Sequence, residues 1–312
     1  MPAGKPVALV VGASRGIGRQ VAIDLANNGY AVVVAAKTVS DPSKPVDPFP
    51  PNPNSSASTI TTVAREIASS GGDATAVQVD VRYPESIQAL VAKTISTYGR
   101  IDVLVYNSGA IYWAPVASTP LKRFQLMQRV NPEGLYATVE ATLPHLRPRG
   151  RIVVVSPPIY SRFFRGKTAY AMGKIGMSVL TKGLAMDFER EEGNEMAITS
   201  IWPAVPKAIE SAATEQFTVT NPDEANDLRK GTIFSDAILA ILKAPSSVVN
   251  GELLLDEDFL RDYAGVTDFS KYSVVPGTSP RRMLPLKLPD LTVAEQDDQG
   301  KRYDSNKDKA KL

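Results

Sequence analysis

The chain of 312 residues has no cysteine, one histidine and almost no excess of charge of either sign, and each lack narrows its chemistry. Without cysteine it forms no disulfide, thiol nucleophile or thiolate metal site. His145 alone builds neither a catalytic triad nor a metal cluster, so we interpret it as a structural or surface residue. The formal net charge is +2, with basic and acidic residues interspersed. We therefore expect no metal and no nucleic-acid partner.

The sequence also lacks an apolar run long enough to span a membrane, and Met1 to Pro6 has no signal-peptide core. We therefore expect an intracellular protein. Its last residues, Ala310, Lys311 and Leu312, are a variant of the Ser-Lys-Leu address read by the peroxisomal import receptor. The charged stretch 295–309 is expected to be exposed. A peroxisomal location is the expectation in a eukaryote and a cytoplasmic one otherwise, and the alternative for these residues is a solvated terminus.

Strand and helix patterns alternate along the chain. The expected strands are 6–11, 31–36, 74–79, 101–106, 151–156, 197–202 and 252–255, and the expected helices are 16–28, 58–70, 84–98, 120–146, 168–192 and 232–244. Such alternation predicts an α/β fold in three layers, a doubly wound parallel sheet of about seven strands with helices on both faces. Ligands of such folds bind at the carboxyl ends of the strands.

A glycine-rich segment joins the first expected strand to the first expected helix. Glycine lets the backbone turn sharply and approach a pyrophosphate, while the amides at the start of the helix attract the anion. Glycine-rich turns are common, so this segment is weak evidence when taken alone. The residues expected at a dinucleotide are Gly12, Ser14, Arg15, Gly16, Ile17 and Gly18.

The second expected strand is followed by Lys37 and Thr38. An enzyme that uses NAD usually places an acidic residue there for the ribose hydroxyls, whereas a cation suits the 2′-phosphate of NADP. Arg15 could reach the same phosphate, since two cations around one dianion form charge-assisted hydrogen bonds. We predict NADP rather than NAD, and the alternative is that both cations are merely solvated.

The helix that starts near residue 168 carries Tyr170 and, one turn later, Lys174. A free tyrosine has a pKa near 10, too high for an efficient base at neutral pH. A lysine one turn along the same face, helped by the positive ring of an oxidised nicotinamide, favours the phenolate. We predict that this pair transfers a proton, although an isolated pair is more often plain packing.

Together these motifs resemble the short-chain dehydrogenase/reductase family over residues 5–256. The resemblance rests on the glycine spacing and on Asp80-Val81, Tyr106-Asn107-Ser108-Gly109, Asn131, Ser156 and Tyr170-xxx-Lys174. A narrower likeness, in residues 35–38, 156–158, 201–203, 256–258 and 264–272, is to the hydroxysteroid-dehydrogenase-like protein 2 branch. Some members of that branch carry an added sterol-carrier domain after the dehydrogenase domain. We expect this sequence to be too short to include one.

The resemblance implies roles for several more residues. Asp80 and Val81 would bind the adenine, while Asn107 and Gly109 would shape the floor under the cofactor. Asn131 would mark a distorted helix turn whose free carbonyl holds a water near Lys174. A proline inside a helix removes one hydrogen bond, so Pro132 supports that distortion.

Two residues depart from the family pattern. The serine that orients the substrate usually lies thirteen residues before the tyrosine, where this chain has Pro157. Ser156, one residue earlier, either takes over that role or only caps the next turn. Tyr106 replaces the family's usual asparagine, which we expect to alter packing rather than chemistry.

We expect one domain over residues 1–275 and an extended, mobile tail over 276–312. A proline-rich insert, 40–58, either laps over the adenosine end of the cofactor or is a mobile surface loop. Residues 203–231 stand in the place of the family's substrate lid. Aromatic residues expected near the nicotinamide suggest a bulky, largely apolar substrate, and they are Tyr112, Trp113, Tyr160, Phe164 and Trp202.

The sequence therefore predicts an NADP-dependent enzyme that interconverts a hydroxyl and a carbonyl by hydride transfer, with Tyr170 as acid and base. Two alternatives stay open: a cofactor-binding sensor or scaffold without turnover, and a cyclase or isomerase on the same fold. Because relatives assemble through the helices expected at 84–98, 120–146 and 168–192, a homodimer or homotetramer is also expected.

Overall fold

The computed structural model describes residues 4–41, 52–205, 209–211, 214–282 and 284–291. Its centre is a seven-stranded sheet in the order β3-β2-β1-β4-β5-β6-β7, and every neighbouring pair of strands is parallel. The strands are β1 Val7–Val11, β2 Ala31–Ala36, β3 Asp73–Gln78, β4 Ile101–Tyr106, β5 Leu146–Val155, β6 Ala197–Trp202 and β7 Leu253–Leu255.

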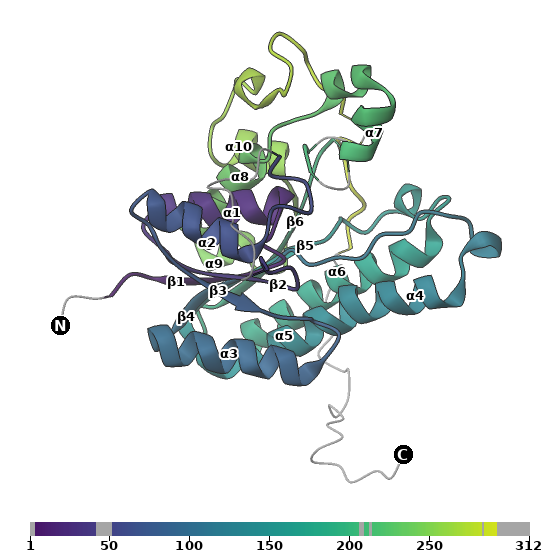
Figure 1. Cartoon of the computed structure of the whole chain (residues 1–312). Helices are drawn as coiled ribbons and strands as arrows, with labels where there is room; N and C mark the ends of the chain where they lie inside the picture. Colours follow the sequence, from purple (N-terminus) through teal and green to yellow (C-terminus); the bar gives the residue numbers. More distant parts are fainter. Residues whose placement is uncertain (1–3, 42–51, 206–208, 212–213, 283, 292–312) are drawn as a thin grey trace, which may run out of the picture.

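Helices cover both faces of this sheet (Figure 1). One layer holds α1 (Gly16–Asn27), α2 (Ile60–Ser69) and α8 (Thr232–Lys243). The opposite layer holds α3 (Pro84–Tyr98), α5 (Gly134–Thr142) and α6 (Thr168–Arg190). The remaining helices are α4 (Leu121–Gln128), α7 (Glu215–Thr220), α9 (Ser246–Val249) and α10 (Asp256–Asp262). The predicted three-layer, doubly wound fold is confirmed.

Two apolar cores, one on each face, hold the layers together. Along β1, Val7, Leu9 and Val11 pack into the core under α3, α5 and α6. Ala8 and Val10 point the other way, into the core under α1 and α8. Successive side chains of a strand point to opposite faces, so a strand covered on both sides is apolar throughout.

The strand order reverses between β1 and β4, where the chain leaves the sheet in opposite directions. In open α/β sheets a ligand crevice forms at this point, outside the carboxyl ends of the strands. The glycine loop follows β1, Asn107 follows β4, Ser156 follows β5 and Trp202 ends β6. The topology therefore brings the predicted site residues to one edge of the sheet.

One expected helix is irregular and ends early in the structure. The stretch expected as a helix over 120–146, with a distorted turn at Asn131, is divided by a π-helical turn at Arg129–Glu133, which contains Pro132. Proline has no N–H to donate, so the regular hydrogen-bond ladder breaks there. The helix then ends at Thr142, and β5 begins at Leu146, five residues before its expected start.

The described part of the proline-rich insert, residues 52–58, packs against the glycine loop. Asn54 is 7% exposed and Ser58 is fully buried, and the Ser58 hydroxyl donates to the carbonyl of Ser14 at 2.6 Å. These residues are therefore packed on the domain, and whether the insert laps over the adenosine end of a cofactor stays a prediction. Residues 42–51 lie outside the described part of the chain.

The beginning of the expected tail also packs on the domain. Leu284 is 5% exposed and lies against Ala204 and Leu255, while Arg282 forms two hydrogen bonds with Asp258. The fold therefore continues past the predicted boundary at residue 275. Residues 292–312, which include the C-terminal Ala-Lys-Leu, lie outside the described part of the chain. Within the described part, none of the helices has the length and hydrophobicity of a membrane span.

Candidate active site

The glycine loop is held tightly against the end of β4. Gly12 has a φ of 92°, and a Cβ there would lie 2.5 Å from the backbone nitrogen of Ser108. The Asn107 side chain donates to the Gly12 carbonyl at 2.9 Å. Only glycine fits this turn, because any side chain would meet neighbouring backbone. The start of α1 is thereby fixed beside the loop after β4, as a dinucleotide-binding loop requires.

The insert reaches this loop as well. The Gly16 amide at the start of α1 donates to the carbonyl of Pro53 at 3.5 Å. A cavity of about 430 Å³ separates residues 52–54 of the insert from the lid residues Ser211 and Thr214. The insert and the lid therefore face each other beside the anion-attracting end of α1.

A group of charges lies near the end of β2. The Lys37 side chain is 68% exposed, with its Nζ 3.6 Å from Asp80 Oδ2. Two hydrogen bonds from the Arg82 side chain hold the pKa of the Asp80 carboxyl at about 2. Arg15 is partly buried, and its side chain makes no ion pair with any residue that the structure describes. Asp80 is therefore ionised at all physiological pH values and already has cationic partners.

Below the loop after β4 lies the floor of the site, where the buried polar side chains are hydrogen-bonded. Asn131 is fully buried, and its side chain accepts from the Ala110 amide at 2.8 Å and donates to the Ala110 carbonyl at 3.1 Å. A Cβ on Gly109 would lie 3.4 Å from Lys174 Nζ. The structure thus brings Gly109, Asn131 and Lys174 together.

The π-helical turn has a further support that the sequence did not indicate. The Tyr106 hydroxyl donates to the Val130 carbonyl inside the turn at 2.6 Å, and Tyr106 is fully buried. Irregular helical turns leave carbonyls without their usual partners. The residue that replaces the family's asparagine therefore stabilises the turn that carries Asn131.

Tyr170 and Lys174 are both deeply buried in α6. Lys174 is 4% exposed, its Nζ donates to the Val155 carbonyl at 2.8 Å, and burial lowers its pKa to about 7. Tyr170 is 2% exposed, and burial raises the pKa of its phenol. The prediction that Lys174, helped by an oxidised nicotinamide, favours the phenolate of Tyr170 concerns the cofactor-bound site and stays a prediction. Desolvation disfavours both charged forms, and a lysine with this pKa is only partly charged at neutral pH.

Ser156 is turned into the core. It is fully buried, its Oγ lies 2.8 Å from Ser200 Oγ, and it accepts from Ser178 Oγ at 3.0 Å. Ser178 Oγ also lies 2.7 Å from the Pro157 carbonyl, so the two acceptors share its single proton. The Ser156 hydroxyl therefore belongs to a buried network between β5, β6 and α6, and the structure shows no hydrogen bond from it to Tyr170.

An aromatic cluster surrounds Tyr170. The ring of Phe163 lies 6.0 Å from Tyr170 and 5.9 Å from Trp202, and Trp113 meets Tyr170 edge-on at 6.1 Å. Tyr160 contacts Phe163 at 6.1 Å. These rings form a largely apolar wall beside the phenol.

Two of the predicted pocket residues lie further out. Tyr112 packs beside this cluster, with the Arg123 guanidinium 5.5 Å from its ring. Phe164 is 37% exposed, and it is Phe163 rather than Phe164 whose ring contacts Tyr170.

Two polar groups in this cluster lack partners. The Tyr170 hydroxyl has no hydrogen bond with any described residue. The indole Nε1 of Trp202 is buried and likewise without an acceptor. A buried donor without a partner costs about 1–3 kcal/mol, so the Trp202 N–H marks a place where a ligand binds or a water sits, whereas the Tyr170 oxygen is not among the fully buried atoms.

The model of the short chain dehydrogenase family matches residues 6–217. The chain belongs to this family. It is 35% identical to mouse hydroxysteroid dehydrogenase-like protein 2 over 93% of its own length and 54% of that protein. The zebrafish protein of the same name is 36% identical, over 86% of this chain and 60% of its own length. A short chain dehydrogenase from Mycobacterium thermoresistibile has the same fold, with a TM-score of 0.75, 34% identity and coverage of 88% and 92%.

This chain thus spans a little over half the length of the curated relatives that it matches. The short chain dehydrogenases are oxidoreductases that bind a nicotinamide dinucleotide. The clamped glycine loop fits that cofactor, because backbone amides at the start of α1 suit its pyrophosphate. Among the described residues no three potential metal ligands come together.

Sequence reasoning missed several parts of this dehydrogenase site. Ser178 lies on the same helix face as Tyr170 and Lys174, at spacings of eight and four residues, and this signal could have found it. Lys167 Nζ lies 4.2 Å from the Phe163 ring centroid, and Leu288 packs, like Trp202, against the cluster of Ala204, Leu255 and Leu284. No sequence pattern indicates Leu288, because it reaches the site from a segment without regular structure.

Proposed function

We propose that this protein is an NADP-dependent oxidoreductase that interconverts a hydroxyl and a carbonyl on a bulky, largely apolar small molecule. The observation that carries the proposal is the Tyr170 hydroxyl, which has no partner among the described residues and stands beside the buried Lys174 and the aromatic wall. A proton donor in an apolar pocket next to a dinucleotide loop suits the reduction of a carbonyl.

The bound nicotinamide supplies or accepts the hydride. Toward the substrate, the raised pKa of Tyr170 keeps the phenol protonated at neutral pH, so it can give its proton to the oxygen of a carbonyl that is being reduced. Lys174, whose pKa is about 7, can return a proton to the phenolate. The Val155 carbonyl holds the lysine in place, and Asn131 fixes the neighbouring loop after β4.

Support for NADP comes from the charges around the adenosine end. Lys37 follows β2 in the place of the acidic residue typical of NAD enzymes. Among the described residues its exposed ammonium pairs with Asp80 alone, at 3.6 Å, and Arg82 can neutralise that carboxylate without it. Lys37 and Arg15 therefore stay available for a 2′-phosphate.

The test is a fluorescence titration of NADPH and NADH into the wild type, Lys37→Glu and the control Lys243→Glu. Lys243, at the end of α8, gives the same change of charge far from the loop. We expect Lys37→Glu to weaken NADPH binding by about 10-fold or more with little effect on NADH. Equal loss in both lysine variants, or equal binding of the two cofactors by the wild type, would contradict the preference.

Turnover is measured separately with a panel of apolar ketones: 2-undecanone, α-tetralone, benzil and 9,10-phenanthrenequinone. Consumption of NADPH with any of these supports the reductase. A second candidate, a cofactor-binding sensor without turnover, is favoured by Pro157 and by the buried Ser156. Tight binding of NADPH without reduction of any ketone would favour the sensor.

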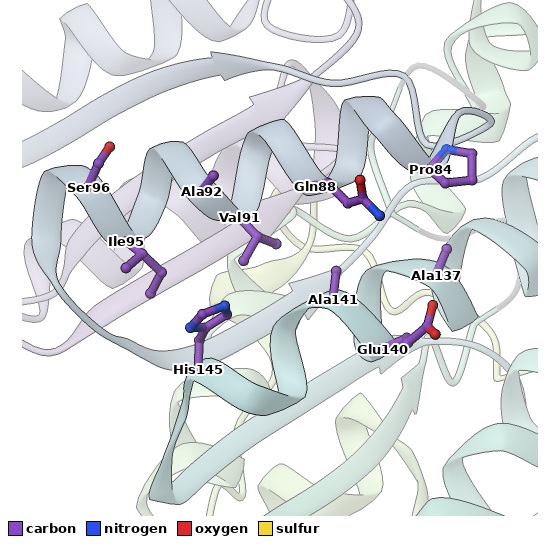
Figure 2. A pocket seen from close by; sticks show the side chains of 10 residues that line it. All are labelled: Pro84, Gln88, Val91, Ala92, Ile95, Ser96, Ala137, Glu140, Ala141 and His145. Atoms are coloured by element: carbon purple, nitrogen blue, oxygen red, sulfur yellow. The ribbon is translucent and has the colours of Figure 1, made fainter. Parts of the chain in front are cut away.

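We also propose a homodimer or homotetramer built on α3, α5 and α6. A groove of about 550 Å³ separates α3 from α5, and Figure 2 shows Val91 and Ile95 facing Ala141 and His145 across it. On the outer side of α6, Met172 and Val179 are 55% and 58% exposed. A second copy of the chain would cover these apolar surfaces, and sedimentation at the mass of one protomer would contradict it.

The peroxisomal address at Ala310–Leu312 stays a prediction. Fusion of the last residues to a fluorescent protein, compared with the same tail lacking Leu312, tests it by location in a eukaryotic cell.

A further inference from the structure

The position that carries the substrate-orienting hydroxyl in most relatives is occupied here by Pro157. The neighbouring Ser156 does not replace it in this structure, since its hydroxyl is bound to Ser178 and Ser200 in the core. If the protein acts on a carbonyl, the oxygen needs a second polar contact besides Tyr170, because transition-state charge on that oxygen is stabilised by fixed donors. The donor must then come from another element.

The end of β6 offers such a donor. Trp202 places its indole ring against Phe163, at 5.9 Å and nearly perpendicular, and the Lys174 ammonium lies 5.5 Å from the same ring. Its Nε1 is buried and has no acceptor. The other buried side-chain atoms without hydrogen bonds, in the part of the chain that the structure describes, belong to arginines or to Glu257. Trp202 is the one uncharged residue among these, and its ring packs in the aromatic cluster around Tyr170.

The surroundings of the ring give it no partner of its own. Trp202 packs among Tyr160, Phe163 and the aliphatic chains of Leu255, Leu284 and Leu288. An indole N–H only donates, and it does not lose its proton in the physiological pH range. Burying it unpaired costs free energy, and that cost is recovered when an oxygen acceptor enters.

We propose that the Trp202 N–H donates a hydrogen bond to the reacting oxygen of the substrate and takes the place of the missing serine hydroxyl. This inference rests on the proposed carbonyl–hydroxyl activity and deepens it. The hydride goes to the carbonyl carbon, Tyr170 gives the proton to the oxygen, and Trp202 keeps its own proton. The acceptor is thus a neutral ketone or alcohol oxygen on an otherwise apolar molecule.

The test compares the wild type with Trp202→Phe, which keeps an aromatic ring and removes the N–H. For the first ketone of the panel above that the wild type reduces, we expect kcat to fall by about 10²-fold with a much smaller change in KM. NADPH affinity should stay the same, since the N–H has no partner to lose among the described residues. The smaller ring also loses packing against Leu255 and Leu284, so the melting temperature should fall somewhat whatever the role of the N–H. A purely structural tryptophan would show that loss of stability with kcat nearly intact.

A second measurement reads the N–H directly. The chain has two tryptophans, so ¹⁵N-labelled protein gives two indole signals, and Trp113→Phe identifies the one from Trp202. With NADP⁺ bound, addition of that same ketone should shift the Trp202 signal to lower field. A shift caused by the cofactor alone, with no further change on adding ketone, would assign the donor to the cofactor and overturn the proposal.

Failure of this inference is distinct from failure of the proposed function. If no ketone of the panel is reduced, the oxidoreductase proposal on these substrates falls, and the role of Trp202 falls with it. If a ketone is reduced and Trp202→Phe reduces it at the wild-type rate, only the role of Trp202 is overturned.

Discussion

Polar groups in the floor of the site have hydrogen-bond partners, whereas two polar groups in its aromatic wall have none among the described residues. In the floor, Asn131 is bound to the Ala110 backbone, Lys174 to Val155 and Tyr106 to Val130. In the wall, the Tyr170 hydroxyl and the Trp202 N–H have no partner among the described residues. Groups whose hydrogen bonds are complete fix geometry, whereas those left incomplete are available to a ligand. The difference separates residues that position from residues that react.

The sharpest way to break this comparison is to remove the Tyr170 hydroxyl. We expect Tyr170→Phe to lower kcat by about 10²- to 10⁴-fold, because proton transfer to the oxygen is lost. The free energy of unfolding should not fall, since the hydroxyl has no hydrogen bond with a described residue. Ketone reduction and urea denaturation measure the two effects, with NADPH binding as the control. If the variant were destabilised but kept its turnover, Tyr170 would be a residue that fixes geometry rather than one that reacts.

Sequence reasoning was most successful where local backbone chemistry decides the structure. Glycine spacing located the loop that meets Asn107, and Pro132 located the irregular turn. It did less well with side chains that meet across elements. The direction of the Ser156 hydroxyl depends on Ser178 and Ser200, which are 22 and 44 residues away in the sequence.

The electrostatics of the tyrosine could not be predicted for a similar reason. The spacing of Tyr170 and Lys174 on α6 suggested an ammonium acting on a phenol. The burial of both depends on rings such as Phe163 and on the loop after β4, and burial shifts the two pKa values against ionisation. Helical spacing gives proximity, but desolvation is set by the whole fold.

Asp256 is a third case beside the floor and the wall. It has hydrogen-bond partners, but they do not offset the effect of burial on the pKa of its carboxyl. Its Oδ1 accepts from the amides of Ala204 and Glu257, yet burial raises its pKa from 3.8 to about 7. A raised folded-state pKa contributes stability below pH 4 that is lost as the pH rises to about 7. Asp256→Asn keeps an acceptor for both amides and cannot ionise.

We therefore expect Asp256→Asn to gain stability relative to the wild type between pH 4 and 7, on the order of 4 kcal/mol at 1.4 kcal/mol per pKa unit. The difference should be constant below pH 4 and above about pH 8. Urea denaturation at each pH measures it. A difference that does not change with pH would mean that the carboxyl titrates alike in the folded and unfolded chains.

Ser156→Ala tests whether a hydroxyl with partners in the core also acts on the substrate. We expect kcat to change by less than about 3-fold, while the free energy of unfolding falls by about 1–2 kcal/mol because Ser178 and Ser200 lose a partner. Kinetics with the reduced ketone and urea denaturation provide the two readings. A 10²-fold loss of kcat at unchanged stability would make Ser156 the orienting hydroxyl and remove the need for Trp202.

Tyr106→Phe is the counterpart of Tyr170→Phe and has the smallest expected effect. Both tyrosines are buried, but the Tyr106 hydroxyl is bonded to the Val130 carbonyl in the π-helical turn. Its removal leaves that carbonyl without this partner, so we expect the free energy of unfolding to fall by about 1 kcal/mol, with kcat nearly unchanged. Urea denaturation and ketone reduction measure the pair of effects. A fall in kcat would contradict this expectation. It would mean that the π-helical turn that carries Asn131 affects the reaction, and that Tyr106 is more than a residue that fixes geometry.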